Sequence, residues 1–249
     1  ISDIEQGPDG LVYCAIRGSR VYNSNPPRWS GGIIVVDIDN PENISTIDTS
    51  YLSYYTSSNN DLPYQVVLDV EFDSDGNLWV ANPYCINGNS PIHVRSPDGI
   101  WKHFGSHDTE TSLSYTPISI AFDNYNRTWV SSFKAADINI GIPNGGIAVL
   151  SFSGYPFNPN SIFWNQINLN GTVWSMGIGD NDRLYYLTPS GLNYYDLKPG
   201  LNPVLSENLY PYFPNISFGT GSKINIDFQG NIWASSSIQG VYILQENTS

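Results

Sequence analysis

The sequence predicts an all-β fold, a β-propeller built from four-stranded antiparallel blades, on the basis of three observations. Gly and Pro account for 22 and 17 of the 249 residues, which leaves little room for long helices. Aromatic residues make up 14% of the chain and charged residues only 13%, whereas a disordered chain has few aromatics and many charges. The third observation is an internal repeat of about 55 residues, close to the length of one propeller blade.

Each repeat consists of an apolar stretch, a tight acidic or Gly-containing turn and an aromatic-led strand. The clearest copies are VEFDSDGNLWVAN at 70–82, IAFDNYNRTWVSS at 120–132 and INIDFQGNIWASS at 224–236. Weaker copies are DIEQGPDGLVYCA at 3–15 and MGIGDNDRLYYLT at 176–188. We expect the aligned aromatic residues to pack between neighbouring blades, where a large rigid ring fills the wedge between twisted sheets. These anchors are Tyr13, Trp79, Trp129, Tyr185 and Trp233.

The second repeat shows how one blade forms. We expect its four strands at about residues 65–72, 77–82, 91–96 and 99–104. The Asp-Gly pair at 75–76 predicts a tight hairpin between the first two strands, because Gly readily takes the positive φ that such turns need. Four antiparallel strands in every repeat predict a propeller blade, whereas a β-sandwich of this length would show no such repeat.

The repeats also divide the chain. They predict blades at about residues 1–60, 61–112, 113–170, 171–220 and 221–249, the last without its outer strand. The chain is therefore either one five-bladed propeller domain or a fragment of a larger ring. A Gly opens the third strand in most of these repeats, at Gly31, Gly145, Gly191 and Gly240.

The second repeat also carries a resemblance to a known family. The pattern FDSDGNLWVAN…IHVRSPDGIWKHF at 72–104 resembles the two-component-regulator propeller repeats of bacterial sensor ectodomains. It is also similar to the propellers of PorZ-like type IX secretion and surface proteins. Repeats one and four depart from the pattern, with Tyr in place of Trp. The resemblance implies a periplasmic, cell-surface or secreted propeller used for recognition, in rings of roughly six to eight blades.

The charge of the chain limits its partners. Lys and Arg number 10 and Asp and Glu 23, so the formal net charge is −13. An acidic surface repels phosphate backbones, which argues against nucleic acid as a partner. No apolar run approaches the roughly 18 residues that would span a bilayer. We expect a protein or carbohydrate ligand, with flanking domains of the same precursor as further partners.

Long loops gather on one predicted face of the blades, where the second-to-third strand loops and the crossings between blades lie. The long second-to-third loops are residues 17–30, 83–90 and 133–144. Exposed aromatics with an occasional cation suit a protein or glycan partner, although the same rings would also serve to fill the central funnel. The candidate binding residues are Tyr22, Arg28, Trp29, Tyr64, Tyr84, His107 and Lys134.

Metal and disulfide sites are weakly indicated. Asp73 and Asp75 resemble the start of a calcium loop, but its twelfth position is Tyr84 rather than Glu, so a plain β-turn is the better interpretation. His103 and His107 lie close in sequence, but one belongs to a strand and the other to a loop. We therefore assign no metal or cofactor. Cys14 and Cys85 are either one disulfide or two buried free thiols.

No catalytic residue is assigned, because the chain contains no nucleophile motif and no phosphate loop. The alternative function is a propeller enzyme of the lyase or lactonase kind, with its active site in the central funnel. The opening DIEQGPDGLVY resembles the first segments of propeller lactonases, and the Asp-x-x-Gly-x-x-Trp turns resemble those of virginiamycin B lyases. A lyase also needs an active His, and His93 lies in a third strand rather than at the funnel. The sequence therefore favours a non-catalytic extracytoplasmic recognition and scaffold module.

Overall fold

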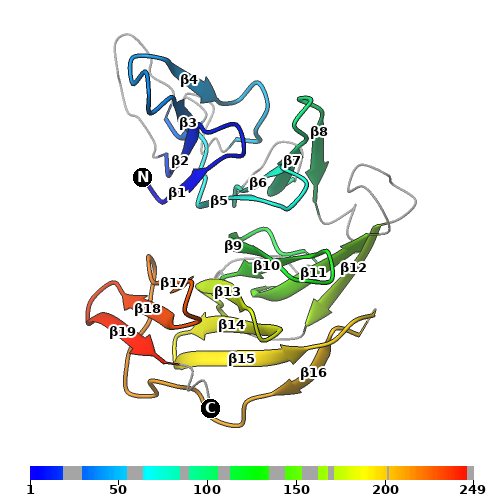
Figure 1. Ribbon diagram of the computed structural model, residues 1–249, viewed down its shortest axis with the longest axis vertical. Helices are drawn as coiled ribbons and strands as arrows, with labels where there is room; N and C mark the ends of the chain where they lie inside the picture. The colour runs from blue at the N-terminus through cyan, green and yellow to red at the C-terminus, as the bar shows by residue number, and fades with distance from the viewer. Residues whose placement is uncertain are drawn as a thin grey trace. The chain divides into compact units, whose positions relative to one another are not determined.

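The computed structural model of the protein describes residues 1–18, 30–54, 64–84, 90–105, 113–134, 144–152, 162–167, 171–200 and 202–245. The described residues form nineteen strands in five antiparallel sheets and no helix (Figure 1). The chain divides into two compact units, the first ending at Ile120 and the second beginning at Ala121. The predicted all-β propeller of antiparallel blades is confirmed.

The first unit contains two four-stranded blades. Each strand is hydrogen-bonded to the next along the chain, so the sheet order follows the sequence. Blade 1 contains β1 (Asp3–Gln6), β2 (Val12–Ile16), β3 (Gly32–Val36) and β4 (Ile44–Ile47). Blade 2 contains β5 (Asp69–Phe72), β6 (Leu78–Ala81), β7 (Ile92–Arg95) and β8 (Trp101–Phe104).

The remaining strands form three blades. Blade 3 begins with β9 (Pro117–Phe122), which runs from the first unit into the second. It continues with β10 (Arg127–Ser132), β11 (Gly146–Phe152) and β12 (Ile162–Ile167). Blade 4 contains β13 (Ser175–Gly179), β14 (Arg183–Thr188), β15 (Gly191–Leu197) and β16 (Val204–Glu207). Blade 5 has the three strands β17 (Lys223–Ile226), β18 (Ile232–Ser236) and β19 (Gly240–Leu244).

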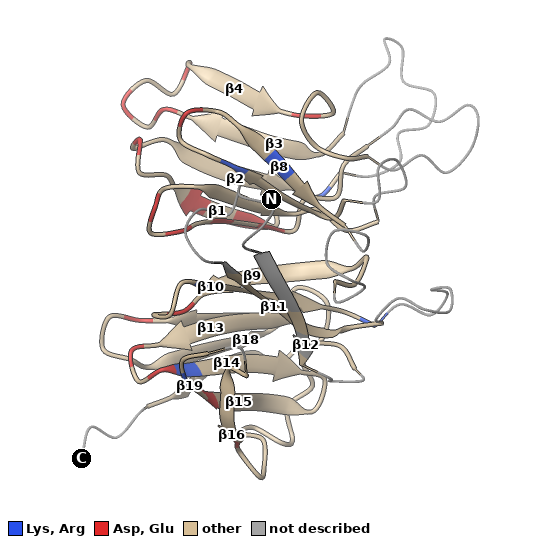
Figure 2. Cartoon of the chain, turned by 90° about the vertical axis from the view of Figure 1, so that its right-hand side faces the viewer, with Lys and Arg blue, Asp and Glu red and all other residues tan. Residues whose placement is uncertain are grey.

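An aspartate organises the first hairpin of blades 2, 3 and 5. In blade 2 the Asp73 carboxylate accepts hydrogen bonds from the backbone N–H of Asp75 (3.1 Å) and Asn77 (2.8 Å). It also accepts one from the indole Nε1 of Trp79, at 2.8 Å. One carboxylate therefore closes the turn and orients the anchor ring. Many other acidic residues also lie in the turns between strands, as Figure 2 shows in red.

The other two hairpins of this type repeat the arrangement. Trp129 Nε1 donates to Asp123 at 2.7 Å, and Trp233 Nε1 donates to Asp227 at 2.9 Å. Each carboxylate again accepts backbone N–H groups two and four residues further on. The recurring Asp-x₅-Trp spacing in the sequence therefore corresponds to this hydrogen-bonded hairpin.

Blades 1 and 4 use a different pairing. Their anchors are tyrosines, and Gly7 and Gly179 stand where the other blades have Asp. The Tyr13 hydroxyl donates to Asp9 at 2.8 Å, and Asn181 Nδ2 donates to the Tyr185 hydroxyl at 3.3 Å. A Cβ at Gly7 would lie 2.5 Å from Asp9 Oδ1 and 2.8 Å from the Tyr13 ring. In these blades, the Tyr anchor, the Gly six residues before it and the polar partner four residues before it therefore take the place of the Asp and Trp pair.

The Gly that opens the third strand has a structural reason, which Gly31 illustrates. Its φ is +93°, and a Cβ there would lie 2.0 Å from the backbone oxygen of Gln65 in the segment that crosses to blade 2. The crossing segment therefore passes too close for any side chain.

The anchor rings differ in burial. Trp79 and Trp129 have no exposed surface, and Tyr13 and Tyr185 are buried. The Trp233 ring is 39% exposed, which differs from the predicted position between blades. Its cross-strand neighbour Ile243 is also exposed.

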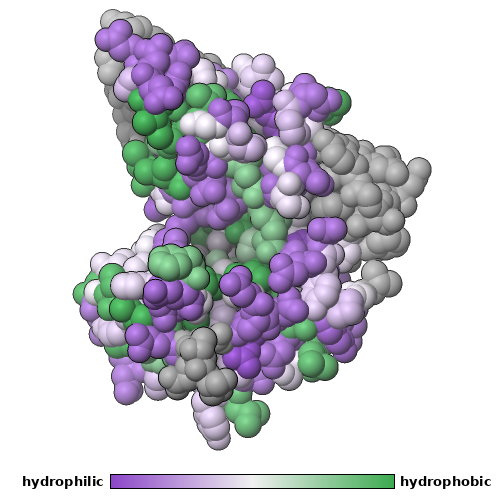
Figure 3. Space-filling view, in the orientation of Figure 1, coloured by the Kyte–Doolittle hydropathy of each residue, from purple (hydrophilic) through white to green (hydrophobic). Residues whose placement is uncertain are grey.

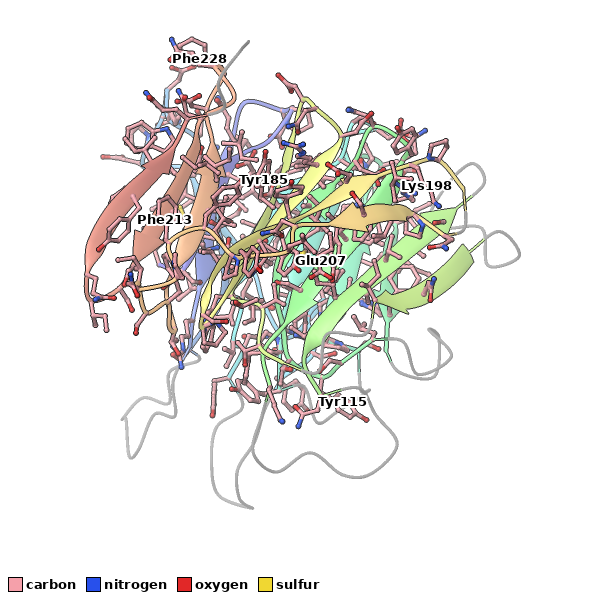
Figure 4. All side chains as sticks on the ribbon, turned by 90° about the horizontal axis from the view of Figure 1, so that it is seen from below. Tyr115, Tyr185, Lys198, Glu207, Phe213 and Phe228 are labelled. Carbon is pink, nitrogen blue, oxygen red and sulfur yellow. The ribbon has the colours of Figure 1, made fainter. Side chains whose placement is uncertain are left out.

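Blade 5 carries further apolar side chains on its surface. Phe228 projects from the β17–β18 hairpin, whereas Tyr185 lies among the strands (Figure 4). Apolar surface is visible in green where β17–β19 lie (Figure 3). The opposite face, with Ile232 and Ala234, packs on Tyr185 and Leu187 of blade 4.

Replacing Trp129 with Ala should lower the free energy of unfolding by about 3–5 kcal/mol, because a fully buried ring leaves a cavity. The same change at Trp233 should cost markedly less, on the order of 1 kcal/mol, because that ring is already partly in water. Urea unfolding followed by circular dichroism measures both variants. Equal losses would contradict the assignment of Trp129 as a buried wedge and Trp233 as a surface ring.

Candidate recognition surface

Two of the predicted binding residues, Tyr64 and Tyr84, come close to Arg17 in the first unit. Tyr84 follows β6 and is 41% exposed. Burial of the rest of the side chain raises the pKa of Tyr84, the Arg17 charge lowers it, and Tyr64 raises it further. The three side chains therefore lie within electrostatic reach of one another. With Tyr115, whose backbone contacts Tyr84, they form what we name the loop-side tyrosine cluster.

Backbone hydrogen bonds hold these residues in place. Arg17, at the end of β2, pairs with Val66 in an isolated antiparallel bridge, and Ser30 pairs with Tyr64 in a parallel one. The Tyr84 N–H donates to the backbone oxygen of Tyr115 at 3.1 Å. The end of β2, the end of β6 and two crossing segments therefore meet at one place, which positions the cluster without relying on long side chains.

The backbone of Tyr84 is unusual, with a φ of +65° in the left-handed region. Side chains other than Gly, Asn and Asp rarely adopt this conformation, because Cβ crowds the following carbonyl oxygen. Here the bond to Tyr115 helps to hold it, and the ring remains partly in solvent. A strained backbone that presents an aromatic side chain is typical of binding positions.

The cluster is suited to recognition. Tyrosine rings offer large rigid contact area with a polar tip, and Arg supplies charged hydrogen-bond donors. The neutral Tyr84 hydroxyl both donates and accepts hydrogen bonds.

The other predicted binding residues are not brought into this cluster. Lys134 follows β10 in the second unit, is exposed, and donates its backbone N–H to Thr172 Oγ1 at 2.9 Å. The remaining four, Tyr22, Arg28, Trp29 and His107, lie outside the described residues.

Sequence reasoning missed Arg17 and Tyr115. Arg17 begins the long predicted loop at residues 17–30, and Tyr115 lies in the segment that crosses from blade 2 to blade 3, so their position at the loop-bearing ends of the blades was available as a signal. Which residues of two different segments meet is a tertiary property, and no local pattern selects them.

His93 serves the interior of blade 2. Its ring is fully buried, its Nδ1 lies 2.7 Å from Nδ1 of His103 on β8, and its Nε2 lies 3.2 Å from Nδ2 of Asn82. Burial, and then the charge of His103, lowers the pKa of His93 to about 3. His93 is therefore neutral at ordinary pH and joins β7 to β8.

The candidate metal and disulfide residues have the following positions. Within the described part of the chain, no group of three or more His, Cys, Asp or Glu side chains is arranged to hold a metal ion. The Asp73 carboxylate accepts hydrogen bonds from its own hairpin, including two from Asn77 Nδ2 at 3.0 and 2.8 Å. Cys14 lies in β2 and Cys85 lies outside the described residues, so the two alternatives for this pair, one disulfide or two free thiols, both stand.

Comparison with known proteins supports the repeat. Residues 61–84 match the family model described as "Two component regulator propeller". No curated protein matches the chain in sequence. PorZ, a surface component of the type IX secretion system of Porphyromonas gingivalis, aligns with 99% of this chain and 40% of its own, at 14% identity and a TM-score of 0.55. The predicted resemblance to two-component-regulator and PorZ-like propellers is confirmed.

Two enzymes have the same fold. Virginiamycin B lyase from Staphylococcus aureus aligns with 99% of this chain and 70% of its own, at 14% identity and a TM-score of 0.52. A gluconolactonase from Xanthomonas campestris aligns with 97% of this chain and 70% of its own, at 12% identity and a TM-score of 0.59. At these identities the likeness shows the fold alone. In the described residues, no helix is long and apolar enough to cross a membrane.

The buried His93 predicts a pH dependence. In the unfolded chain His93 has a pKa of about 6.5 and takes up a proton below it, whereas folded His93 stays neutral down to about 3. Stability should therefore fall by about 2 kcal/mol as the pH is lowered from about 7 to 5. The variant His93→Gln should be less stable at pH 7 but lose less on acidification.

Urea midpoints of wild type and His93→Gln at several pH values in this range measure the difference. Carboxylates contribute little there, because their unfolded pKa values lie lower. Parallel pH profiles for the two proteins would contradict a buried neutral His93.

Proposed function

We propose that this chain is a non-catalytic recognition and scaffold module that acts outside the cytoplasm and binds a protein or glycan partner through its loop-bearing side. The observation that carries the proposal is the loop-side tyrosine cluster around Arg17 and Tyr84. Exposed tyrosines beside an Arg are the composition of binding hot spots, and loops held by a rigid scaffold commonly carry them.

Charge narrows the class of partner. The net charge of −13 makes association with nucleic acid or anionic lipid unfavourable, because both carry dense negative charge. Arg17 and Lys134 are local positive groups on a negative chain. Protein and carbohydrate surfaces, which combine hydrogen-bonding groups with apolar faces, fit the tyrosines better.

The comparisons support an extracytoplasmic role. PorZ is a bacterial surface component of a secretion system, and the matched family model is named for two-component regulators. This chain spans 40% of the length of PorZ, so assembly into a sensor or a secretion-associated surface protein is part of the proposal.

A propeller enzyme is the second candidate, because a lyase and a gluconolactonase have the same fold. Incubation of the purified chain with gluconolactone and with quinupristin, followed by mass spectrometry, tests it. We expect both compounds to remain intact. Ring opening of either at a rate proportional to protein concentration would contradict a non-catalytic role.

Replacing Tyr84 with Asn should weaken partner binding by about tenfold or more without unfolding the blade. Asn tolerates the positive φ of this position, so the change removes the ring and keeps the backbone. A binder selected by the wild type from a glycan array and from a panel of bacterial surface proteins is titrated against the variant by calorimetry.

Phe228→Asn is the matched control, because Phe228 is 93% exposed in the β17–β18 turn and outside the cluster. We expect it to bind like the wild type. If Tyr84→Asn binds as tightly as Phe228→Asn, the loop-side tyrosine cluster is not the recognition surface.

A further inference from the structure

A polar cavity opens between blades 1 and 2, within the first unit. Its volume is about 350 Å³. It is built on the β1–β2 turn of blade 1, on β3 and β4, and on the β7–β8 hairpin of blade 2. We name it the blade 1–2 pocket, and the lining residues that matter here are Asp9, Tyr13, Ser45, Tyr51, Arg95 and Trp101.

A comparison with blade 3 explains why the sequence of blade 1 leaves this pocket open. In blade 3 the same place is filled by Trp129 and Arg127, both buried. Arg127 Nη1 donates to the backbone oxygens of Lys198 (2.7 Å) and Gly200 (3.2 Å) in the β15–β16 turn of blade 4. A Trp anchor with Arg two residues before it therefore closes the space between two blades.

Blade 1 has smaller residues at these two positions. Tyr13 replaces the Trp, and Leu11, which cannot donate a side-chain hydrogen bond, replaces the Arg. The corresponding β7–β8 turn of blade 2, at Gly99, then borders a cavity. The same correlation appears at the other Tyr anchor, where a cavity of about 550 Å³ lies beside Tyr185. The change from Trp to Tyr thus accompanies a pocket in both blades that carry it.

Polar groups of balanced charge line the blade 1–2 pocket. The Tyr13 hydroxyl donates to Asp9 at 2.8 Å, and Arg95 is close enough to hydrogen-bond to Tyr13. Burial, followed by the bond to Asp9, raises the pKa of Tyr13 to about 12, so the hydroxyl stays protonated. One carboxylate and one guanidinium offset each other, so the pocket favours neither cations nor anions.

Aromatic rings form another part of the wall. Tyr51 stacks on Trp101, with ring centroids 5.5 Å apart and planes inclined by 21°. Tyr51 is 51% exposed, although the side chain is large and apolar. Such rings provide a flat apolar surface at the mouth of a site whose interior is polar.

We propose that the blade 1–2 pocket binds a single neutral sugar ring. Sugar hydroxyls donate to a carboxylate and accept from a guanidinium, and the pocket is lined by one of each, Asp9 and Arg95. The C–H face of the ring packs on an aromatic surface such as Tyr51. The volume falls at the lower end of the roughly 300–1,000 Å³ typical of ligand sites, as one ring requires. The pocket shares no residue with the loop-side tyrosine cluster, and neither proposal depends on the other.

Saturation-transfer NMR and titration of the full chain with D-glucose, D-galactose, D-mannose and N-acetyl-D-glucosamine test this site. We expect at least one of them to bind. Tyr51→Ala, which removes the aromatic wall, should weaken its binding by about tenfold. Ser45→Phe, on the exposed edge strand β4, places a ring in the pocket and should abolish binding. Binding of the chain to immobilised oligosaccharides that end in the same sugars is measured as well, and shows whether the ligand is a free sugar or a glycan terminus.

Two controls keep the outcome decisive. Tyr210→Ala removes a tyrosine that is 82% exposed in the second unit and should leave sugar binding unchanged. Tyr84→Asn should also leave it unchanged, which separates this site from the loop-side tyrosine cluster. The proposal is overturned if no sugar binds, if Tyr51→Ala and Ser45→Phe bind as the wild type does, or if Tyr84→Asn abolishes binding. Thermal melts of all variants confirm that they are folded.

Discussion

The structure depends on one local interaction, the hydrogen bond from an indole N–H to the aspartate that begins the same hairpin. In blade 3, Asp123 accepts from the Trp129 indole and from two backbone N–H groups, so a single carboxylate sets both the turn and the orientation of the ring. The direction of the ring is therefore set within the hairpin itself and does not depend on a neighbouring blade. The cost of burying the polar indole N–H and the carboxylate is offset by their mutual bond.

The same constraint explains the two divergent blades. A tyrosine ring is smaller than an indole and carries its polar atom at its tip, further from the backbone than the indole nitrogen, so it cannot use an aspartate six residues earlier in the same way. Blade 1 moves the acceptor to Asp9, four residues before Tyr13, and leaves Gly7 at the original place because a side chain there would collide with both. The apparent degeneration of the repeat is therefore a set of linked substitutions, and polar groups line the space that they leave beside Tyr13.

Much of the fold was predictable, because the Asp-x₅-Trp spacing and the Gly-containing turns are local signals that survive in a single sequence. The antiparallel blades and the resemblance to propeller repeats followed from them. Tyr64 and Tyr84 were predicted from loop position, but Arg17 was not, since its approach to Tyr84 depends on how the segment at residues 64–67 pairs with the end of β2. The exposure of Trp233 was also beyond sequence reasoning, because its Asp-x₅-Trp hairpin is as complete as that of Trp129.

At Trp233 the contribution of the hairpin hydrogen bond can be told apart from the contribution of ring packing, whereas the two occur together at Trp79 and Trp129. The Trp233 indole bonds to Asp227 at 2.9 Å although the ring is 39% exposed, so the hairpin geometry does not require burial between blades. Hydrogen bonding within the hairpin fixes the shape of each blade, and packing of the ring adds stability only where another surface covers it. The two candidate binding sites relate differently to these contributions. The loop-side tyrosine cluster lies in loops that no hairpin bond of this kind constrains, and the blade 1–2 pocket lies where the smaller anchor Tyr13 leaves the wedge unfilled.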